Sequence, residues 1–314
     1  DTMHEHGCQS RRCGAAPFAR AGAEAHYPPD LRIEPVHMAL ALRVEPEARR
    51  LSGTNTITLA GRGGGGRELR LHAVGFTDVD VRSDRPLRGW SYDGSTIVVT
   101  FEDAIEDGAA AVVTVVYTVV DPVTGLYFSA PTADAPDAPR YAATDNETER
   151  ARHWMPCVDL PAVRPRLDFA LRASVDLTIL ANGRHVGEEL HDDGTQTVRW
   201  SLDAPCPSYL TCFAIGDFVA WHDAPLGDVP IAAYTVAPFA PHHLERSFGR
   251  TRDMLTWMQQ KLGVPYPFPK YYQFALPGFG GAMENISLVS WDDVFLLDEA
   301  LATEWSRLVD QVNV

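Results

Sequence analysis

Between about residue 31 and residue 225, short runs of alternating hydrophobic and polar residues are separated by turn signals. These runs are Val36–Val44, Thr54–Leu59, Thr96–Phe101, Ala111–Val120, Leu167–Val175, Thr178–Ala181, Thr195–Leu202 and Ser208–Phe218. A period of two is typical of strands that bury one face. Asp-Gly and Asn-Gly pairs at 93–94, 182–183 and 193–194 mark tight turns. Because no helical period intervenes, the pattern predicts an antiparallel β-sandwich or β-saddle.

The pattern changes to a helical one near residue 240. Apolar residues recur at helical spacing from Leu244 to Leu262, and Gly263 follows as a stop signal. We expect the methionines and Trp257 on this face to belong to the core. Strands are predicted over Tyr271–Leu276 and Gly281–Ser290, and a further helix is predicted to start near residues 300–304. This order predicts the opening of an α+β domain.

The chain is thus expected to have three parts. Residues 1–27 form a flexible tail, residues 28–225 a mainly β domain, and residues 226–314 the first, incomplete part of an α+β domain. The tail carries histidines and cysteines at positions 4, 6, 8, 13 and 26. Their spacing fits no standard zinc site, because neither CxxC nor HxxxH occurs.

Composition narrows the choice of partners and location. The chain has 314 residues and a formal net charge of -15, with no basic stripe and no apolar run near the roughly 20 residues that span a bilayer. We therefore expect neither a nucleic acid nor a membrane as a partner. Five cysteines are an odd number for a disulfide scaffold, and Cys157, Cys206 and Cys212 are predicted to be buried thiols. With no signal peptide evident, we expect a cytoplasmic location.

The segment Gly281–Asn285 (GAMEN) carries candidate chemistry. Gly280 and Gly281 lack side chains, so another backbone can approach, and an extended peptide can pair with a strand at a sheet edge. Glu284 would then receive an α-ammonium group through a charge-assisted hydrogen bond. The alternative is a glycine-rich turn before an edge strand with one exposed glutamate.

A second acidic site precedes an aromatic, apolar stretch. Thr144–Glu147 (TDNE) runs into Ala151–Asp159 (ARHWMPCVD), and by itself this is an ordinary loop.

Together the two segments resemble the M1 family of zinc aminopeptidases, within the gluzincin group. That family carries GxMEN, matched at Gly281–Asn285, and a TQxE segment that runs into AR-x-x-x-PC-x-D, matched from Thr144 to Asp159. Weaker landmarks occur along the chain in the order that the family shows, and they extend the resemblance over nearly the whole chain from Leu31. They are GLY at 125–127, SYL at 208–210, GDF at 216–218 and YPF at 266–268. Asp145 departs from the family pattern, which usually has Gln at this position.

The resemblance implies an N-terminal β-saddle domain followed by the start of a thermolysin-like catalytic domain. It also implies that Glu284 and Glu147 hold the free amino terminus of a peptide, while the backbone at Gly281 and Ala282 pairs with it. Met283 and Asn285 complete the implied substrate-binding set. Two carboxylates favour a cationic amine and penalise a blocked end, which would leave buried charge unpaired.

The reaction of this family needs zinc held by HExxH and a downstream Glu. No HExxH occurs in these 314 residues, and the nearest grouping, His242-His243 with Glu245, is predicted to be a helix N-terminal cluster. We therefore expect zinc to be bound by residues beyond Val314, and no catalytic or metal-binding residue in this chain. The chain alone is expected to be inactive. Its expected partners are peptides with a free N-terminus and the C-terminal zinc-binding portion of the same enzyme.

Two other functions stay open. One is a non-catalytic M1-like module that uses the saddle as a protein-interaction surface. The other is a plain β-sandwich interaction protein. The presence of both Glu284 and Glu147 favours the aminopeptidase, since a scaffold needs neither.

Overall fold

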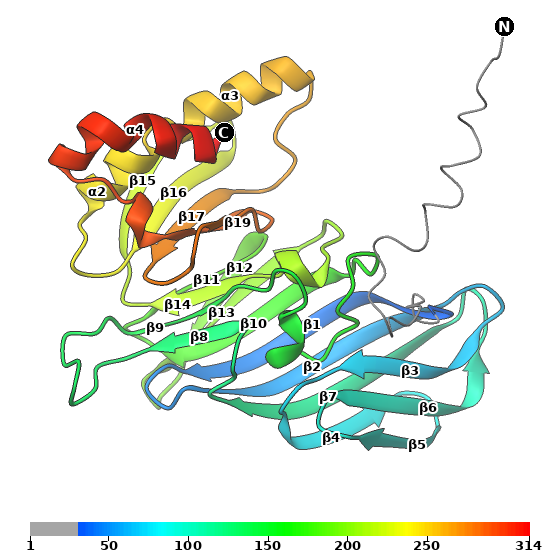
Figure 1. Cartoon of the computed structure of the whole chain (residues 1–314). Helices are drawn as coiled ribbons and strands as arrows, with labels where there is room; N and C mark the ends of the chain where they lie inside the picture. The colour runs from blue at the N-terminus through cyan, green and yellow to red at the C-terminus, as the bar shows by residue number, and fades with distance from the viewer. Residues whose placement is uncertain (1–30) are drawn as a thin grey trace, which may run out of the picture. The chain divides into compact units, whose positions relative to one another are not determined.

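The computed structural model describes residues 31–314 (Figure 1). The tail expected at residues 1–27, with its histidines and cysteines, lies outside the described residues. The fold is mainly β and ends in helices, which confirms the predicted fold class.

The largest element is a seven-stranded sheet with the order β12-β13-β10-β1-β2-β7-β4. Its strands are β1 (Ile33–Glu45), β2 (Arg50–Gly61), β4 (Thr77–Ser83), β7 (Ala110–Val120), β10 (Arg166–Ser174), β12 (Arg184–Leu190) and β13 (Thr195–Leu202). All neighbours are antiparallel except β1 and β10, which are parallel. The prediction of a purely antiparallel sheet was wrong at this pair, because more than 100 residues separate the two strands and the chain can return in the same direction.

Two smaller sheets lie against this one. Strands β3 (Gly66–His72), β6 (Thr96–Ile105) and β5 (Leu87–Tyr92) form the first, in which β3 contacts β1 and β5 contacts β4. Strands β11 (Thr178–Ala181), β14 (Phe213–Gly216), β9 (Tyr141–Thr144) and β8 (Leu126–Ser129) form the second, which reaches the large sheet through β11.

Alternation along the strands explains the core of this region. In β7, Ala111, Val113 and Val115 are buried, while Val112 and Thr114 between them are half-buried, as the period of two predicts. The run Ser208–Phe218 departs from its prediction as one strand. Its first part is a 3-10 turn, Ser208–Leu210, because the Ser208 hydroxyl donates inward to the buried Asp159 at 2.6 Å.

A five-stranded sheet makes up the C-terminal region, with the order β15-β16-β17-β19-β18. Its strands are β15 (Val219–Leu226), β16 (Val229–Thr235), β17 (Tyr271–Leu276), β18 (Ala282–Met283) and β19 (Leu288–Asp292). The domain change expected at 225/226 falls at the end of β15, which pairs with β16, so this sheet begins at Val219. The division into domains itself stays a prediction.

The helical stretch predicted from Leu244 to Leu262 consists of two helices, α2 (Pro241–Phe248) and α3 (Thr251–Leu262). In α2, Leu244 and Phe248 are buried in a cluster with Trp291 of β19 and Val309 of α4 (Glu299–Asn313). The prediction that the apolar face of α3 is core was wrong: Trp257 is 50% exposed and Leu262 is 64% exposed. Thr251 is the buried residue of this helix, because α3 begins where the chain leaves that cluster.

The strand predicted over Gly281–Ser290 was also wrong as a single element. It is a reversal: β18 pairs antiparallel with β19, and Ser287 between them has φ of +64°. The prediction of a helix starting near residues 300–304 matches α4, where the Asp298 side chain caps the first turn by accepting from the Leu301 N–H. No helix within residues 31–314 is long and apolar enough to cross a bilayer.

Candidate functional site

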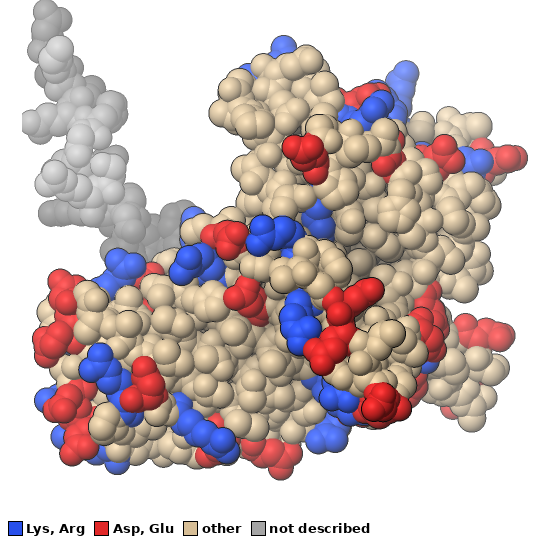
Figure 2. All heavy atoms as spheres, turned by 180° about the vertical axis from the view of Figure 1, so that it is seen from behind, with Lys and Arg blue, Asp and Glu red and all other residues tan. Residues whose placement is uncertain are grey.

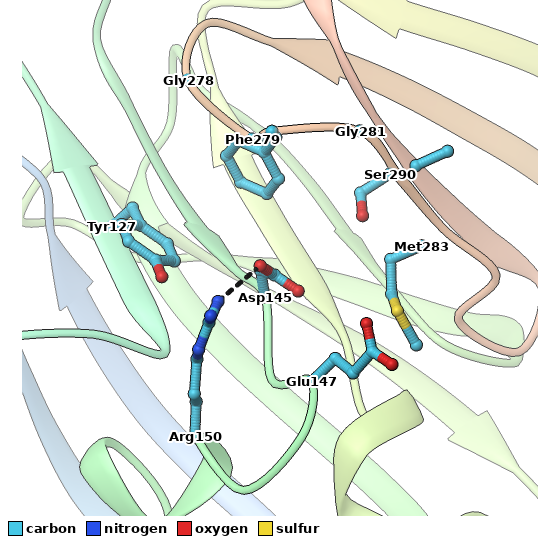
Figure 3. A pocket seen from close by; sticks show the side chains of 11 residues that line it. Tyr127, Asp145, Glu147, Arg150, Gly278, Phe279, Gly281, Met283 and Ser290 are labelled. Carbon is cyan, nitrogen blue, oxygen red and sulfur yellow. Dashed lines mark hydrogen bonds and ion pairs between the residues drawn. The ribbon is translucent and has the colours of Figure 1, made fainter.

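A pocket of about 330 Å³ lies where two segments distant in sequence meet (Figure 3). One segment runs from β9 through the loop after it, and the other precedes and includes β18. The pocket is lined by Tyr127, Asp145, Glu147, Arg150, Gly278, Phe279, Gly280, Gly281, Ala282, Met283 and Ser290. A carboxylate-bearing loop therefore faces a glycine-rich strand edge.

Buried side chains hold the loop that carries Glu147. Asn146 is fully buried, accepts a hydrogen bond from the Trp154 indole N–H at 2.8 Å, and donates to the Thr211 carbonyl. Its own carbonyl accepts from the Arg150 N–H at 3.0 Å. A buried amide satisfied in this way fixes its loop strongly, because each lost partner would leave a polar group without a hydrogen bond.

A second buried group fixes the segment that follows. Asp159 is 1% exposed and accepts hydrogen bonds from the Ser208 hydroxyl at 2.6 Å and from Arg152 Nε at 3.0 Å. Its backbone N–H donates to His72 Nδ1 at 3.0 Å. The PCxD stretch at 156–159 is therefore a structural support for the loop, at a distance from the pocket wall.

Asp145 and Arg150 form an ion pair in the pocket wall, with 3.1 Å between Oδ2 and Nη1. Burial raises the pKa of the Asp145 carboxyl, and the Arg150 guanidinium lowers it by a smaller amount. The adjacent wall is aromatic, since the rings of Tyr127 and Phe279 lie 5.8 Å apart. In Figure 3 the Glu147 side chain points toward Met283 rather than toward this ion pair.

Backbone interactions hold the opposite wall. Gly278 and Gly280 have φ of +78° and +69°, and Gly281 has φ of +144°. Side chains other than hydrogen are strained in such conformations. The Asp292 carboxylate accepts from the Gly280 N–H at 2.8 Å, and the Asp292 N–H donates to the Gly281 carbonyl at 2.7 Å. A Cβ at any of these three glycines would meet nothing within 4 Å, so the space above them is open.

The structure brings four of the six predicted substrate-binding residues to the pocket: Glu147, Gly281, Ala282 and Met283. Glu284 does not line it. Exposure alternates from Ala282 to Asn285, which places Glu284 on the exposed side with Ala282. Asn285 is 2% exposed, and its amide donates to the Met283 carbonyl at 3.4 Å and the Ser290 hydroxyl at 3.3 Å. The binding roles of all six residues stay predictions.

Sequence reasoning missed several pocket residues, namely Arg150, Gly278, Phe279 and Ser290. Tyr127 was noted as a landmark and Asp145 as a departure, without a place in the pocket. Arg150 lies three residues after Glu147, so its nearness to the carboxylates was a signal in the sequence. Ser290 had none, because its position depends on the reversal between β18 and β19.

Within residues 31–314, no group of three or more His, Cys, Asp or Glu side chains is placed to hold a metal ion. These residues therefore do not fit zinc. His243 caps helix α2 by accepting from the Ala240 N–H through Nδ1 at 3.1 Å, which confirms the predicted N-terminal cluster. Cys157, Cys206 and Cys212 are buried free thiols, as predicted, and burial raises the pKa of the Cys206 and Cys212 thiols to about 12.

Charge on the molecular surface is mixed. On the face shown in Figure 2, basic and acidic side chains are interspersed over the described residues. At the pocket, two carboxylates and one guanidinium leave a formal excess of one negative charge. This excess favours a cationic ligand group.

Comparisons with known proteins agree with the two motifs. The sequence model described as the Peptidase M1 N-terminal domain matches residues 34–210, and the one described as the Peptidase family M1 domain matches residues 246–314. Aminopeptidase N of Lactobacillus delbrueckii subsp. lactis is 30% identical over 281 residues, which are 84% of this chain and 31% of that protein. Aminopeptidase 2 of Candida albicans is 26% identical over 280 residues, or 88% of this chain and 29% of the relative. Glutamyl aminopeptidase of Bos taurus is 30% identical over 171 residues, or 53% and 18%. The chain thus spans less than a third of the length of these relatives.

Proposed function

The chain belongs to peptidase family M1, and from this premise we propose that it is the part of an aminopeptidase that anchors the free amino terminus of a peptide. Glu147 and Glu284 bind the α-ammonium group in this proposal, and the free edge of β18 pairs with the first residues of the peptide. An aminopeptidase-related role agrees with the aminopeptidases among its relatives.

One observation carries the proposal. The pocket places the Glu147 carboxylate beside Gly281, Ala282 and Met283, which form the last strand of the five-stranded sheet and the residue before it. A strand edge recognises extended peptides through main-chain hydrogen bonds, with little regard to sequence. A carboxylate at the end of that edge adds a requirement for positive charge.

Selection for a free amine follows from these two parts. A peptide with an N-terminal ammonium satisfies the carboxylates, whereas an acetylated or internal segment places a neutral amide against them. A carboxylate that loses water without gaining a charge partner is destabilised by several kcal/mol in a dry site, and by less in an open one. The pocket is open, so we expect a moderate preference, on the order of tenfold to a hundredfold.

Peptide-bond cleavage is not assigned to residues of this chain. We propose that hydrolysis requires a zinc-binding portion of the same enzyme, because the described residues offer no metal site. The role of residues 31–314 is then binding and orientation of the peptide end.

Glu147→Gln tests the proposal. The dissociation constants of a short peptide and of its N-acetylated form are measured on the 314-residue chain by calorimetry. The unsubstituted chain should prefer the free amine, and Glu147→Gln should lose most of that preference. Glu284→Gln should weaken it in the same direction.

Glu149→Gln is the matched control. Glu149 lies on the same loop but pairs with Arg152 at 3.1 Å on the surface, so its loss should leave the preference unchanged. Equal binding of free and acetylated peptides by the unsubstituted chain would contradict the proposal. That result would favour the non-catalytic interaction module instead.

A further inference from the structure

Lys270 carries a buried ammonium group outside the pocket. It is one of two lysines in the chain, lies just before β17 and is 3% exposed. Its Nζ donates to the Ala181 carbonyl at 2.8 Å, and to the carbonyl and hydroxyl oxygens of Ser287, each at 3.1 Å. Nζ also lies 4.9 Å from the centre of the Trp200 ring and 5.2 Å from that of Tyr272. Three acceptors and two ring faces surround this cation.

The acceptors belong to two regions of the fold. Ala181 ends β11 in the N-terminal region, and Ser287 lies in the reversal between β18 and β19. Two neighbours of Ala181 reach the same reversal. The Gly183 N–H donates to the Ser287 hydroxyl at 2.7 Å, and the Asn182 amide donates to the Ile286 carbonyl at 2.7 Å. The reversal is thus fastened to the end of β11 by Lys270 together with residues 182 and 183.

The fastening acts on a strained residue. Ser287 has φ of +64°, a left-handed conformation that costs a residue with a side chain about 1–2 kcal/mol. Such a conformation persists where the surrounding contacts over-determine it. Lys270 supplies two of those contacts, one to the backbone of Ser287 and one to its side chain.

The reversal in turn determines where β18 lies. Strand β18 has two residues, paired as Ala282 with Trp291 and Met283 with Ser290, so its ladder is short. Glu284 follows β18 directly and has no ladder pairing of its own. Its position therefore depends on the residues that close the reversal behind it, which are those that Lys270 holds.

We propose that Lys270 is a positioning residue for the amine-binding segment, which it holds in place by fastening Ser287 to the end of β11. The inference rests on the proposed function, because it assumes that β18 and Glu284 bind a peptide amino terminus. Lys270 does not line the pocket and acts through Ser287. The fastening does not require the charged form, since a neutral amine keeps two of the three donors.

Lys270→Met removes the donors and keeps the length of the side chain. On the 314-residue chain we expect it to reduce the preference for a free over an N-acetylated peptide about tenfold, the equivalent of about 1.4 kcal/mol. Lys261→Met is the matched control, because the Lys261 ammonium lies over the Trp257 ring of α3, and neither residue lines the pocket. It should leave the preference unchanged.

Ser287→Ala tests the same inference if the Lys270→Met chain does not fold. It removes the hydroxyl that accepts from Lys270 and Gly183 and keeps the backbone carbonyl, so a smaller loss of about threefold is expected. A folded Lys270→Met or Ser287→Ala chain that retains the full preference would overturn the inference. Failure of the proposed function looks different, because the unsubstituted chain would then show no preference at all.

Discussion

The two walls of the pocket are held by different means. The Glu147 wall is placed by buried side chains, chiefly Asn146 and Asp159, whose hydrogen-bond partners lie 7 to 65 residues away in the sequence. The β18 wall consists largely of glycines with open space above them, and it is fastened at its ends by Asp292 and Lys270. The first wall is rigid because it is packed. The second leaves its backbone free for a ligand because nothing is packed on it.

The same contrast separates the whole regions. In the N-terminal sheets, much of each long strand, such as β2 and β7, alternates between buried and half-buried residues. In the C-terminal region, β18 has two residues, and α3 exposes Trp257 and Leu262. In the proposed function the edge of β18 stays unpaired so that a peptide can bind it, and the region that provides this edge is expected to rely on fewer and more localised contacts.

The largest expected effect is the loss of stability on substitution of a buried residue that holds the Glu147 wall. Asn146→Ala leaves the Trp154 indole N–H and the Thr211 carbonyl without partners in the interior, and should lower the free energy of unfolding by about 3 kcal/mol. Asn285→Ala is the counterpart on the other wall, where the two hydrogen bonds are 3.3 and 3.4 Å long. It should cost about 1 kcal/mol. Urea denaturation measures both, and the reverse ranking would contradict the comparison.

An intermediate effect concerns pH and Lys270. Burial lowers the pKa of Lys270 to about 7, against 10.5 for the exposed side chain. Between these values the unfolded chain binds more protons than the folded one, so stability from this group rises with pH and levels off near pH 10.5. Below pH 7 both states are protonated and the contribution is flat.

Comparison with Lys270→Met isolates this group. From pH 7 to pH 9.5 the free energy of unfolding of the unsubstituted chain should gain roughly 1–3 kcal/mol relative to Lys270→Met. The titratable groups facing Nζ are Cys212, whose pKa is raised to about 12, and Tyr272, whose pKa is raised from 10; both stay neutral over this range. A constant difference between the two chains would show that the ammonium is not desolvated as the structure indicates.

The smallest expected effect is the loss of stability on substitution of a glycine in the β18 wall. Gly281→Ala introduces a Cβ that meets nothing but forces alanine to φ of +144°, which should cost about 1–2 kcal/mol. Gly187→Ala in β12 is the control, since it has open space and no left-handed φ, and its stability should change by less than about 0.5 kcal/mol. Thermal unfolding compares them. Equal stabilities would mean that the conformation of Gly281 is not a constraint on the strand.

Much of the fold could be predicted from local patterns, and the exceptions share a cause. The long strands of the N-terminal region follow the period of two, and β17 coincides with its predicted range Tyr271–Leu276. The reversal after β18 could not be found in this way, because its left-handed residue, Ser287, is not a glycine and so gives no turn signal. Its conformation is held by contacts of Lys270, Asn182 and Gly183, which come from elsewhere in the chain. The exposure of the apolar face of α3 was missed because helical periodicity indicates an apolar face but does not determine whether another part of the chain packs on it.

The candidate site shows the same limit. Glu147 and the GAMEN segment were found from motif and resemblance, and the structure adds that Glu147 and the first three residues of that segment border one pocket. The Asp145–Arg150 pair lies in the same loop as Glu147, but its place in the wall depends on how β9 and β14 pair. Motifs thus identified the chemistry, whereas tertiary structure determined the neighbours.

The most direct test of the proposal that this pocket anchors a peptide amine is the pKa of the bound peptide's own amino group. A short peptide with a ¹⁵N-labelled N-terminus is titrated by NMR, free and bound to the 314-residue chain. A free α-amino group has a pKa of about 7.7–8.0, and carboxylates within about 4–6 Å should raise it by roughly one unit or more. In the Glu147→Gln chain, most of this rise in the pKa of the bound amine should be lost. A bound amine with an unchanged or lowered pKa would contradict the account.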